Sequence, residues 1–147
     1  MAAPTRRQAP PRPLVSRTAR AEGSSVPPDR IRIKRIYEPP SQEDGQRILV
    51  DRLWPRGVGR QRAKLDQWLR EIAPSEGLRH WFHHEAPRWE MFVDRYRSEL
   101  AANPEAVARL AQIIDRGPTT LLYGAKDEER NQALVLAQFM RERFAER

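Results

Sequence analysis

The segment formed by residues 47–57, RILVDRLWPRG, is the feature that most constrains the fold of this chain. Its apolar part, residues 48–50, is short and continuous, and Asp51 and Arg52 follow it directly. A run of this kind is typical of a strand that is covered on both faces, as in a parallel sheet. A proline and a glycine then end the run. The segment therefore predicts a buried strand that delivers polar side chains to the sheet edge where ligands bind in α/β proteins.

Two further segments have strand patterns. In residues 31–36 isoleucines alternate with basic residues, which indicates one buried and one solvated face. Residues 119–123, TTLLY, form another apolar run, which ends at Gly124. Helical stretches between the second and third segments provide the crossover that parallel pairing needs. We therefore expect an α/β fold with a small, mainly parallel sheet of at least three strands and helices packed on it in Rossmann-like layers.

Apolar residues at helical spacing predict five helices along the rest of the chain. The first covers residues 65–72, and a short one covers residues 75–82 with Ser75 as its N-cap. The third carries a stripe of Trp89, Phe92 and Tyr96, predicted to lie in the core rather than to form an exposed platform for bases. The last two begin at the Asn-Pro-Glu of residues 103–105 and after a cap at Asp127.

The composition favours one cytoplasmic domain. With 147 residues the chain is long enough for a single hydrophobic core. It contains no cysteine, which excludes disulfides, thiolate metal sites and a thiol nucleophile and suits a reducing compartment. No apolar stretch approaches the roughly 20 residues that span a bilayer, and no secretory signal is evident. We therefore expect a cytoplasmic location and no membrane partner.

The charge is concentrated at the N-terminus. The net charge is +7, and residues 1–30 hold six arginines against two acidic residues, which leaves only +3 for residues 31–147. Residues 1–30 are also rich in Pro, Arg, Ala and Ser, which predicts a disordered tail before a single domain of residues 31–147. The alternatives are a basic arm that binds phosphates, a true start further in, such as Val26, or a transit peptide, against which the prolines count.

Four stretches carry a resemblance to a known family: residues 31–39, residues 44–57, residues 73–75 with 78–79 and 81–82, and residues 119–123 with 125–127. Through them, the chain resembles the YeaO-like branch of a bacterial domain family of unknown function over about residues 31–140. The resemblance implies a compact cytosolic α/β domain and no agreed activity. Relatives often carry histidine at the position of Gln132, and more distant ones show a Cys-His-Arg cluster. This chain has glutamine at that position and no cysteine, so a mechanism that needs this histidine or a thiol is not expected of it.

Residues that follow the three predicted strands are expected to share one crevice, because parallel strands end at the same sheet edge. The candidate site consists of Tyr37, Asp51, Arg52, Trp54, Arg56, Tyr123, Lys126, Asp127 and Asn131. The arginines could hold a phosphate or carboxylate bidentately, and Asp51 could act as an acid or base if burial raised its pKa. The structural alternative is that Asp51 pairs with an arginine and fixes the loop, while Trp54 fills the core.

Other motifs are weaker. Gly57 and Gly59 flank a turn whose amides could receive a phosphate, but the chain has no Walker or dinucleotide fingerprint. His80 and His84 are four residues apart, yet no third ligand is evident, so no metal site is predicted. Ser75 has no Gly-x-Ser-x-Gly context, so a nucleophilic triad is not supported.

The leading hypothesis is a domain that binds a small anionic ligand, nucleotide-like or phosphorylated, in this crevice. Asp51 is the candidate catalytic residue if the protein is an enzyme, which the sequence does not decide, and no cofactor is named by it. The alternative is a nucleic-acid-binding or regulatory module that uses the arginine-rich tail, with steeply salt-dependent affinity. A third option is a scaffold for a partner, which would show an exposed apolar patch.

Overall fold

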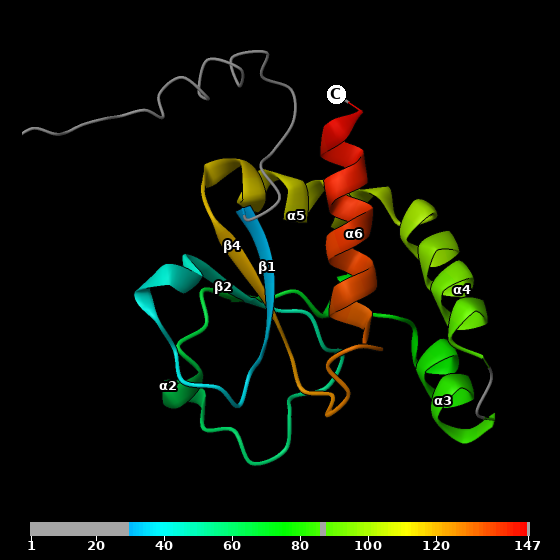
Figure 1. The fold of residues 1–147 in the computed structure, drawn as a ribbon, viewed down its shortest axis with the longest axis horizontal. Helices are drawn as coiled ribbons and strands as arrows, with labels where there is room; N and C mark the ends of the chain where they lie inside the picture. The colour runs from blue at the N-terminus through cyan, green and yellow to red at the C-terminus, as the bar shows by residue number, and fades with distance from the viewer. Residues whose placement is uncertain (1–29, 86–87, 147) are drawn as a thin grey trace, which may run out of the picture.

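A computed structural model describes residues 30–85 and 88–146. The fold is built on a four-stranded sheet with helices packed on it (Figure 1). The strands follow the order β1-β4-β2-β3, and every pair is parallel. Their bounds are Ile31–Arg35 for β1, Gln46–Leu49 for β2, Gln67–Trp68 for β3 and Thr119–Tyr123 for β4. The predicted α/β fold with a parallel sheet is therefore confirmed. The predicted tail lies outside the described residues, apart from Arg30.

The register brings the ends of β1, β2 and β4 to one edge. Leu122 of β4 pairs with Lys34 of β1 on one side and with Leu49 of β2 on the other. Beyond the strands, the N–H of Val50 donates to the carbonyl oxygen of Leu122 over 3.0 Å. The chain therefore leaves all three strands at the same end of the sheet.

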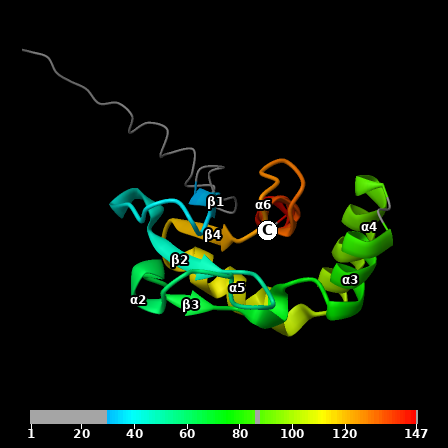
Figure 2. The same ribbon diagram turned by 90° about the horizontal axis from the view of Figure 1, so that it is seen from below.

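One face of the sheet carries the main core and most of the helices. These are α3 (Glu76–Glu85), α4 (Trp89–Ala101), α5 (Pro104–Arg116) and α6 (Gln132–Ala145). Helix α6 packs on β1 and β4 and lies between the sheet and α4, while α3 packs on α4 (Figures 1 and 2). The core includes Ile31, Ile48, Leu121 and Leu136, and burying each such side chain contributes about 1.5–3 kcal/mol. None of the helices among residues 30–85 and 88–146 could span a membrane.

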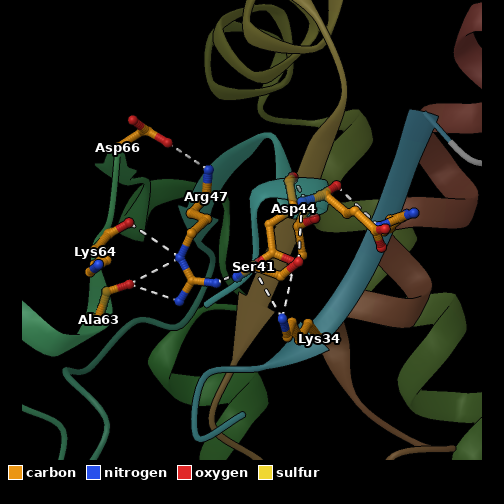
Figure 3. A network of polar contacts seen from close by, with 10 residues as sticks. Lys34, Ser41, Asp44, Arg47, Ala63, Lys64 and Asp66 are labelled. Carbon is orange, nitrogen blue, oxygen red and sulfur yellow. Dashed lines mark hydrogen bonds and ion pairs between the residues drawn. The ribbon is translucent and has the colours of Figure 1, made fainter. Parts of the chain in front are cut away.

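The second face carries a smaller core and a network of buried charges. Ile36, Leu49, Ala63 and Leu122 form this core together with half-buried aromatic side chains near the short helix α2 (Arg60–Ala63). Beside it, the carboxylate of Asp44 lies between Lys34 and Arg47 (Figure 3). Arg47 also donates to the carbonyl oxygens of Ala63 and Lys64. The network joins β1, the turn η3 (Gln42–Asp44), β2 and α2.

The prediction of a helix over residues 65–72 is wrong. The chain there forms β3 and the 3-10 turn η4 (Arg70–Ile72). Lys64 has a φ of 48°, which ends α2, and the N–H of Asp66 then donates to the carbonyl oxygen of Arg47 over 2.8 Å. Hydrogen bonds to β2 at this sheet edge stabilise a short strand in place of the helix that the spacing of the apolar residues predicts. Leu69 and Ile72 are buried all the same.

The remaining helices lie close to their predicted positions. Ser75 caps α3, since its Oγ accepts from the N–H of Leu78 over 3.1 Å. In the predicted aromatic stripe of α4, Phe92 and Tyr96 are buried. The cap of α6 differs from the prediction, because Asn131 holds that position and accepts from the N–H of Leu134. The carboxylate of Asp127 instead closes the preceding turn, where it accepts from two backbone N–H groups.

Candidate functional site

A cavity of about 270 Å³ opens at the edge where β1, β2 and β4 end. Its wall comes from parts of the chain that are far apart in the sequence. They are the loops after β1 and β2, the segment from the end of β4 to the start of α6, and α3 and α4 together with Pro74, which precedes α3. The lining residues are Tyr37, Asp51, Arg52, Leu53, Trp54, Pro55, Arg56, Pro74, Arg79, Phe82, His83, Phe92, Gly124, Ala125, Arg130, Asn131 and Gln132.

Asp51 joins the parts of this site. One carboxylate oxygen accepts from the N–H of Gly124 over 2.9 Å, and the other accepts from the side-chain amide of Gln132. Burial raises the pKa of Asp51 to about 6, against the opposing effect of these hydrogen bonds and of the charge of Arg79. No cation of the described residues forms an ion pair with Asp51. Asp51 therefore fixes the strand ends through neutral donors, not through an arginine.

Gly124 is required for this close approach. A Cβ atom built there would lie 2.9 Å from Oδ2 of Asp51 and 3.2 Å from Cβ of Pro55. The absence of a side chain therefore lets the end of β4 contact both the carboxylate and the loop after β2.

Arg52 lines the cavity, but its guanidinium is largely occupied. Nε donates to the carbonyl oxygen of Pro74 over 3.0 Å, and Nη2 donates to that of Ala73 over 3.1 Å. These bonds hold the loop after β2 against the segment that leads into α3. Arg52 therefore has a structural role that the sequence did not indicate.

Tyr37 and Arg56 build the rim of the cavity. The hydroxyl of Tyr37 donates to the carbonyl oxygen of Arg56 over 2.7 Å, and both residues are exposed. The guanidinium of Arg35 lies 4.8 Å from the centre of the Tyr37 ring and donates to the carbonyl oxygen of Ala125. The rim thus ties the loops after all three strands to one another.

Trp54 combines the two roles considered from the sequence. It lines the cavity, and it also packs against the small core on the second face of the sheet. Its indole N–H donates to the carbonyl oxygen of Val58 over 2.8 Å, and its ring meets the ring of Trp68 edge-on at 5.4 Å. The ring is therefore a fixed wall.

Three of the candidate residues lie outside the cavity lining: Tyr123, Lys126 and Asp127. Tyr123 is 2% exposed and belongs to the main core, and burial is the main cause of its raised pKa. Lys126 and Asp127 are exposed on the turn that the Asp127 carboxylate closes. Asn131 lines the wall, but its side chain is used in the cap of α6 and in a bond to the carbonyl oxygen of Asp127.

The helices α3 and α4 and the first residue of α6 also contribute to the cavity, and the sequence did not predict this contribution. Arg79, Phe82, His83, Phe92 and Gln132 line the cavity. Helical spacing could have placed Arg79 and Phe82 near one another on α3, but nothing in the sequence shows which helix faces the strand ends. Burial, together with the charges of Arg79 and His84, lowers the pKa of His83.

The histidines of α3 contact each other. The rings of His80 and His84 stack with 3.9 Å between their centres, and Nδ1 of His84 lies 2.9 Å from the carbonyl oxygen of His80. In the part of the chain that the structure describes, no three His, Asp or Glu side chains are grouped so that they could hold a metal ion.

Comparison with known proteins identifies relatives of the chain but no solved structure that matches. It is 49% identical to the uncharacterized protein YeaO of Escherichia coli (strain K12) over 111 residues, 76% of this chain and 96% of that protein. It is 38% identical to the uncharacterized protein Rv3073c of Mycobacterium tuberculosis (strain H37Rv), again over 111 residues and 93% of that protein. A family model described as the inactive DUF488-N3 subclade matches residues 30–147. The chain therefore belongs to this YeaO-like family of domains of unknown function.

Proposed function

We propose that this domain binds a small anionic ligand, nucleotide-like or otherwise phosphorylated or carboxylated, in the cavity at the ends of β1, β2 and β4. The charge of the wall is the observation that carries the proposal. Four arginines line the cavity against one carboxylate, that of Asp51. Ligands of open α/β sheets bind at this edge, and guanidinium groups suit phosphate and carboxylate oxygens.

Binding without catalysis is the form of this function that we favour. The matching family is described as an inactive subclade, and the chain contains no cysteine. Both oxygens of Asp51 already accept hydrogen bonds that hold the strand ends together. The role we assign to Asp51 is therefore to shape the cavity floor.

Acid or base chemistry at Asp51 is the second candidate. A pKa of about 6 would let this carboxylate exchange a proton near neutral pH, which is the one observation that favours it. A ligand that binds the cavity and is converted by the parent protein, but only bound by an Asp51→Asn variant, would support this candidate over simple binding.

The test is ligand binding to the full chain, measured by thermal shift and calorimetry with inorganic phosphate, adenosine monophosphate and phenyl phosphate. A ligand that prefers the native state raises the melting temperature. Gln132→Met keeps the volume of a cavity residue but removes its amide. Gln138→Met is the matched control, because Gln138 lies on the same helix, is exposed and does not line the cavity.

We expect at least one of these anions to raise the melting temperature of the parent. Gln132→Met should change the affinity at least threefold, and Gln138→Met should leave it unchanged. The proposal fails if no anion shifts the melting temperature at millimolar concentration, or if both variants bind like the parent.

A further inference from the structure

The guanidinium of Arg79 differs from the other polar groups of the cavity because it has a buried donor without a hydrogen-bond partner. Arg79 lies on α3 and lines the cavity wall. Its Nε atom is buried, and it has no hydrogen-bond partner among residues 30–85 and 88–146. Buried donors in folded proteins are nearly always paired, so an unpaired one calls for an explanation.

The positive charge of Arg79 is also not neutralised by contact. The ion pairs of the described residues involve Lys34, Arg47 and Arg97, but not Arg79. The carboxylate of the cavity, that of Asp51, is engaged elsewhere. Burial dominates the pKa shifts of Asp51 and His83, and the charge of Arg79 acts to lower both pKa values. The charge of Arg79 therefore acts on Asp51 across the cavity, but the described residues form no ion pair or hydrogen bond with its guanidinium.

The other arginines of the wall are less suited to hold a ligand. The guanidinium of Arg52 already donates hydrogen bonds to two backbone carbonyl oxygens. Arg56 and Arg130 are exposed, where water and salt screen their charges. Arg79 is thus the cation of the wall that combines a buried, unpaired donor with a charge outside the ion pairs of the described residues.

The wall beside Arg79 is apolar and includes two aromatic rings. The rings of Phe82 and Phe92 lie 4.5 Å apart between centres, and Pro55 and Pro74 also line the cavity. Aromatic side chains favour packing against other flat rings. A volume of about 270 Å³ lies just below the roughly 300–1,000 Å³ of pockets that bind drug-sized ligands, so it suits a small ring compound.

We propose that Arg79 is the anion-binding residue of this cavity, and that the ligand is a small molecule with one ring and one acidic group, a carboxylate or phosphate. The acidic group accepts hydrogen bonds from the guanidinium of Arg79, including its Nε. The ring packs against Phe82 and Phe92. This inference rests on the proposed function and narrows its ligand class.

The test is calorimetric binding of four probes to the full chain: phenyl phosphate, benzoate, inorganic phosphate and benzyl alcohol. The two probes with both a ring and an acidic group should bind at least tenfold more tightly than the two that lack one of them. Arg79→Met should weaken phenyl phosphate binding by about tenfold or more, as expected for a lost hydrogen bond to a charged group. Arg79→Lys, which keeps the charge but loses the fork, should fall between.

The matched control is Arg62→Met, which removes the same charge from an exposed position of α2 outside the cavity. It should bind phenyl phosphate like the parent. Without ligand, Arg79→Met should keep or raise the melting temperature, because the buried Nε has no partner to lose. A marked fall in melting temperature would instead show that Arg79 also stabilises the fold. The comparison would then rest on Arg79→Lys, and parent-like binding of phenyl phosphate by that variant would overturn the inference.

The outcomes separate this inference from the function on which it rests. If the anions bind the parent and Arg79→Met equally, Arg79 is not the binding residue, while the proposed function stands. If inorganic phosphate binds as tightly as phenyl phosphate, the ring requirement is wrong. If no anion binds the parent, the proposed function and this inference fall together. Should Arg79→Met fail to fold, Arg79→Lys carries the same comparison.

Discussion

Two carboxylates lie at the two ends of β2, and their surroundings differ. Asp44, which is 4% exposed, precedes the strand and is paired with Lys34 at 3.0 Å and Arg47 at 2.5 Å (Figure 3). Asp51 follows the strand and contacts only neutral donors, the N–H of Gly124 and the amide of Gln132. The first is part of a closed network, and the second lines a cavity.

The comparison shows that partners, and not burial alone, decide the pKa of a carboxylate that is buried, like Asp44, or half-buried, like Asp51. Burial acts to raise the pKa of both residues. At Asp44 the backbone N–H of Ser41 and the two cations outweigh it, so the pKa is lowered. At Asp51 neutral donors and the charge of Arg79 do not outweigh it, and the pKa rises to about 6. A carboxylate whose charge is fully paired is typical of a structural network. A carboxylate that lines a cavity and forms no ion pair is typical of a candidate ligand or catalytic site.

The largest effect is expected from Asp44→Ala. Removing this carboxylate leaves Lys34 and Arg47 without their counter-charge, which should lower the free energy of unfolding at pH 7 by about 3–5 kcal/mol. Because the pKa of Asp44 is lowered in the native state, this contribution is present above the ordinary value of 3.8 and is lost as the pH falls through the lowered pKa. Chemical denaturation at pH 7 and at pH 3 measures both quantities.

The exposed neighbour Glu43 supplies the control for this experiment. Glu43→Ala should change the free energy of unfolding by no more than about 0.5 kcal/mol. An equal loss in the two variants would show that the network is not what stabilises this end of β2, and the contrast between Asp44 and Asp51 would disappear.

A smaller effect is expected from glycine substitutions on the two sides of β2. Gly45 has a φ of 65°, and a Cβ there would lie 2.3 Å from the carbonyl oxygen of Pro118. Gly45→Ala should therefore destabilise by about 2–4 kcal/mol through backbone strain and overlap. Gly57 has a φ of 79° with no atom within 4 Å of its Cβ position, so Gly57→Ala should cost only about 1–2 kcal/mol. Urea denaturation should rank the two variants in this order. The reverse order would contradict the tight packing at Gly45 and the open space at Gly57.

The smallest effect concerns the pH dependence of Asp51. Since the native pKa of about 6 exceeds the ordinary 3.8, the contribution of Asp51 to stability is fully present below pH 3.8 and is lost as the pH rises to about 6. Asp51→Asn cannot ionise, and Gln132 can rotate its amide to accept from the new side chain. The variant should therefore gain about 1–3 kcal/mol relative to the parent between pH 4 and pH 7. Urea denaturation at several pH values measures this difference. If the free energies of unfolding of the two proteins change in parallel between pH 4 and pH 7, the pKa of Asp51 is not raised in the native state.

The sequence predicted the sheet better than the site. Residues 119–123 were predicted as a strand and form β4 with the same bounds, because a short apolar run between turns leaves little choice. Residues 65–72 were misassigned, because the spacing that suggested a helix also suits a short strand and a turn whose partners lie on β2. Pairing with a distant segment is not visible in local periodicity.

The candidate site shows the same division. Asp51, Arg52, Trp54 and Arg56 line the cavity because they directly follow a strand whose direction the sequence predicts. Lys126 and Asp127 also follow a strand, yet the turn closed by Asp127 keeps them outside the lining. That turn depends on where α6 begins, and the sequence placed its cap four residues too early.

By itself, the sequence determined that β2 and β4 are buried, that β1, β2 and β4 run in parallel and that polar residues gather at one edge, because apolar runs and helical crossovers leave few other arrangements. Only the tertiary structure decided which side chains face the cavity and which of them are already engaged. Arg52 and Arg79 are both arginines near that edge, but one is bound to backbone carbonyl oxygens and the other retains a buried free donor. Such a difference depends on distances between segments that local sequence does not encode.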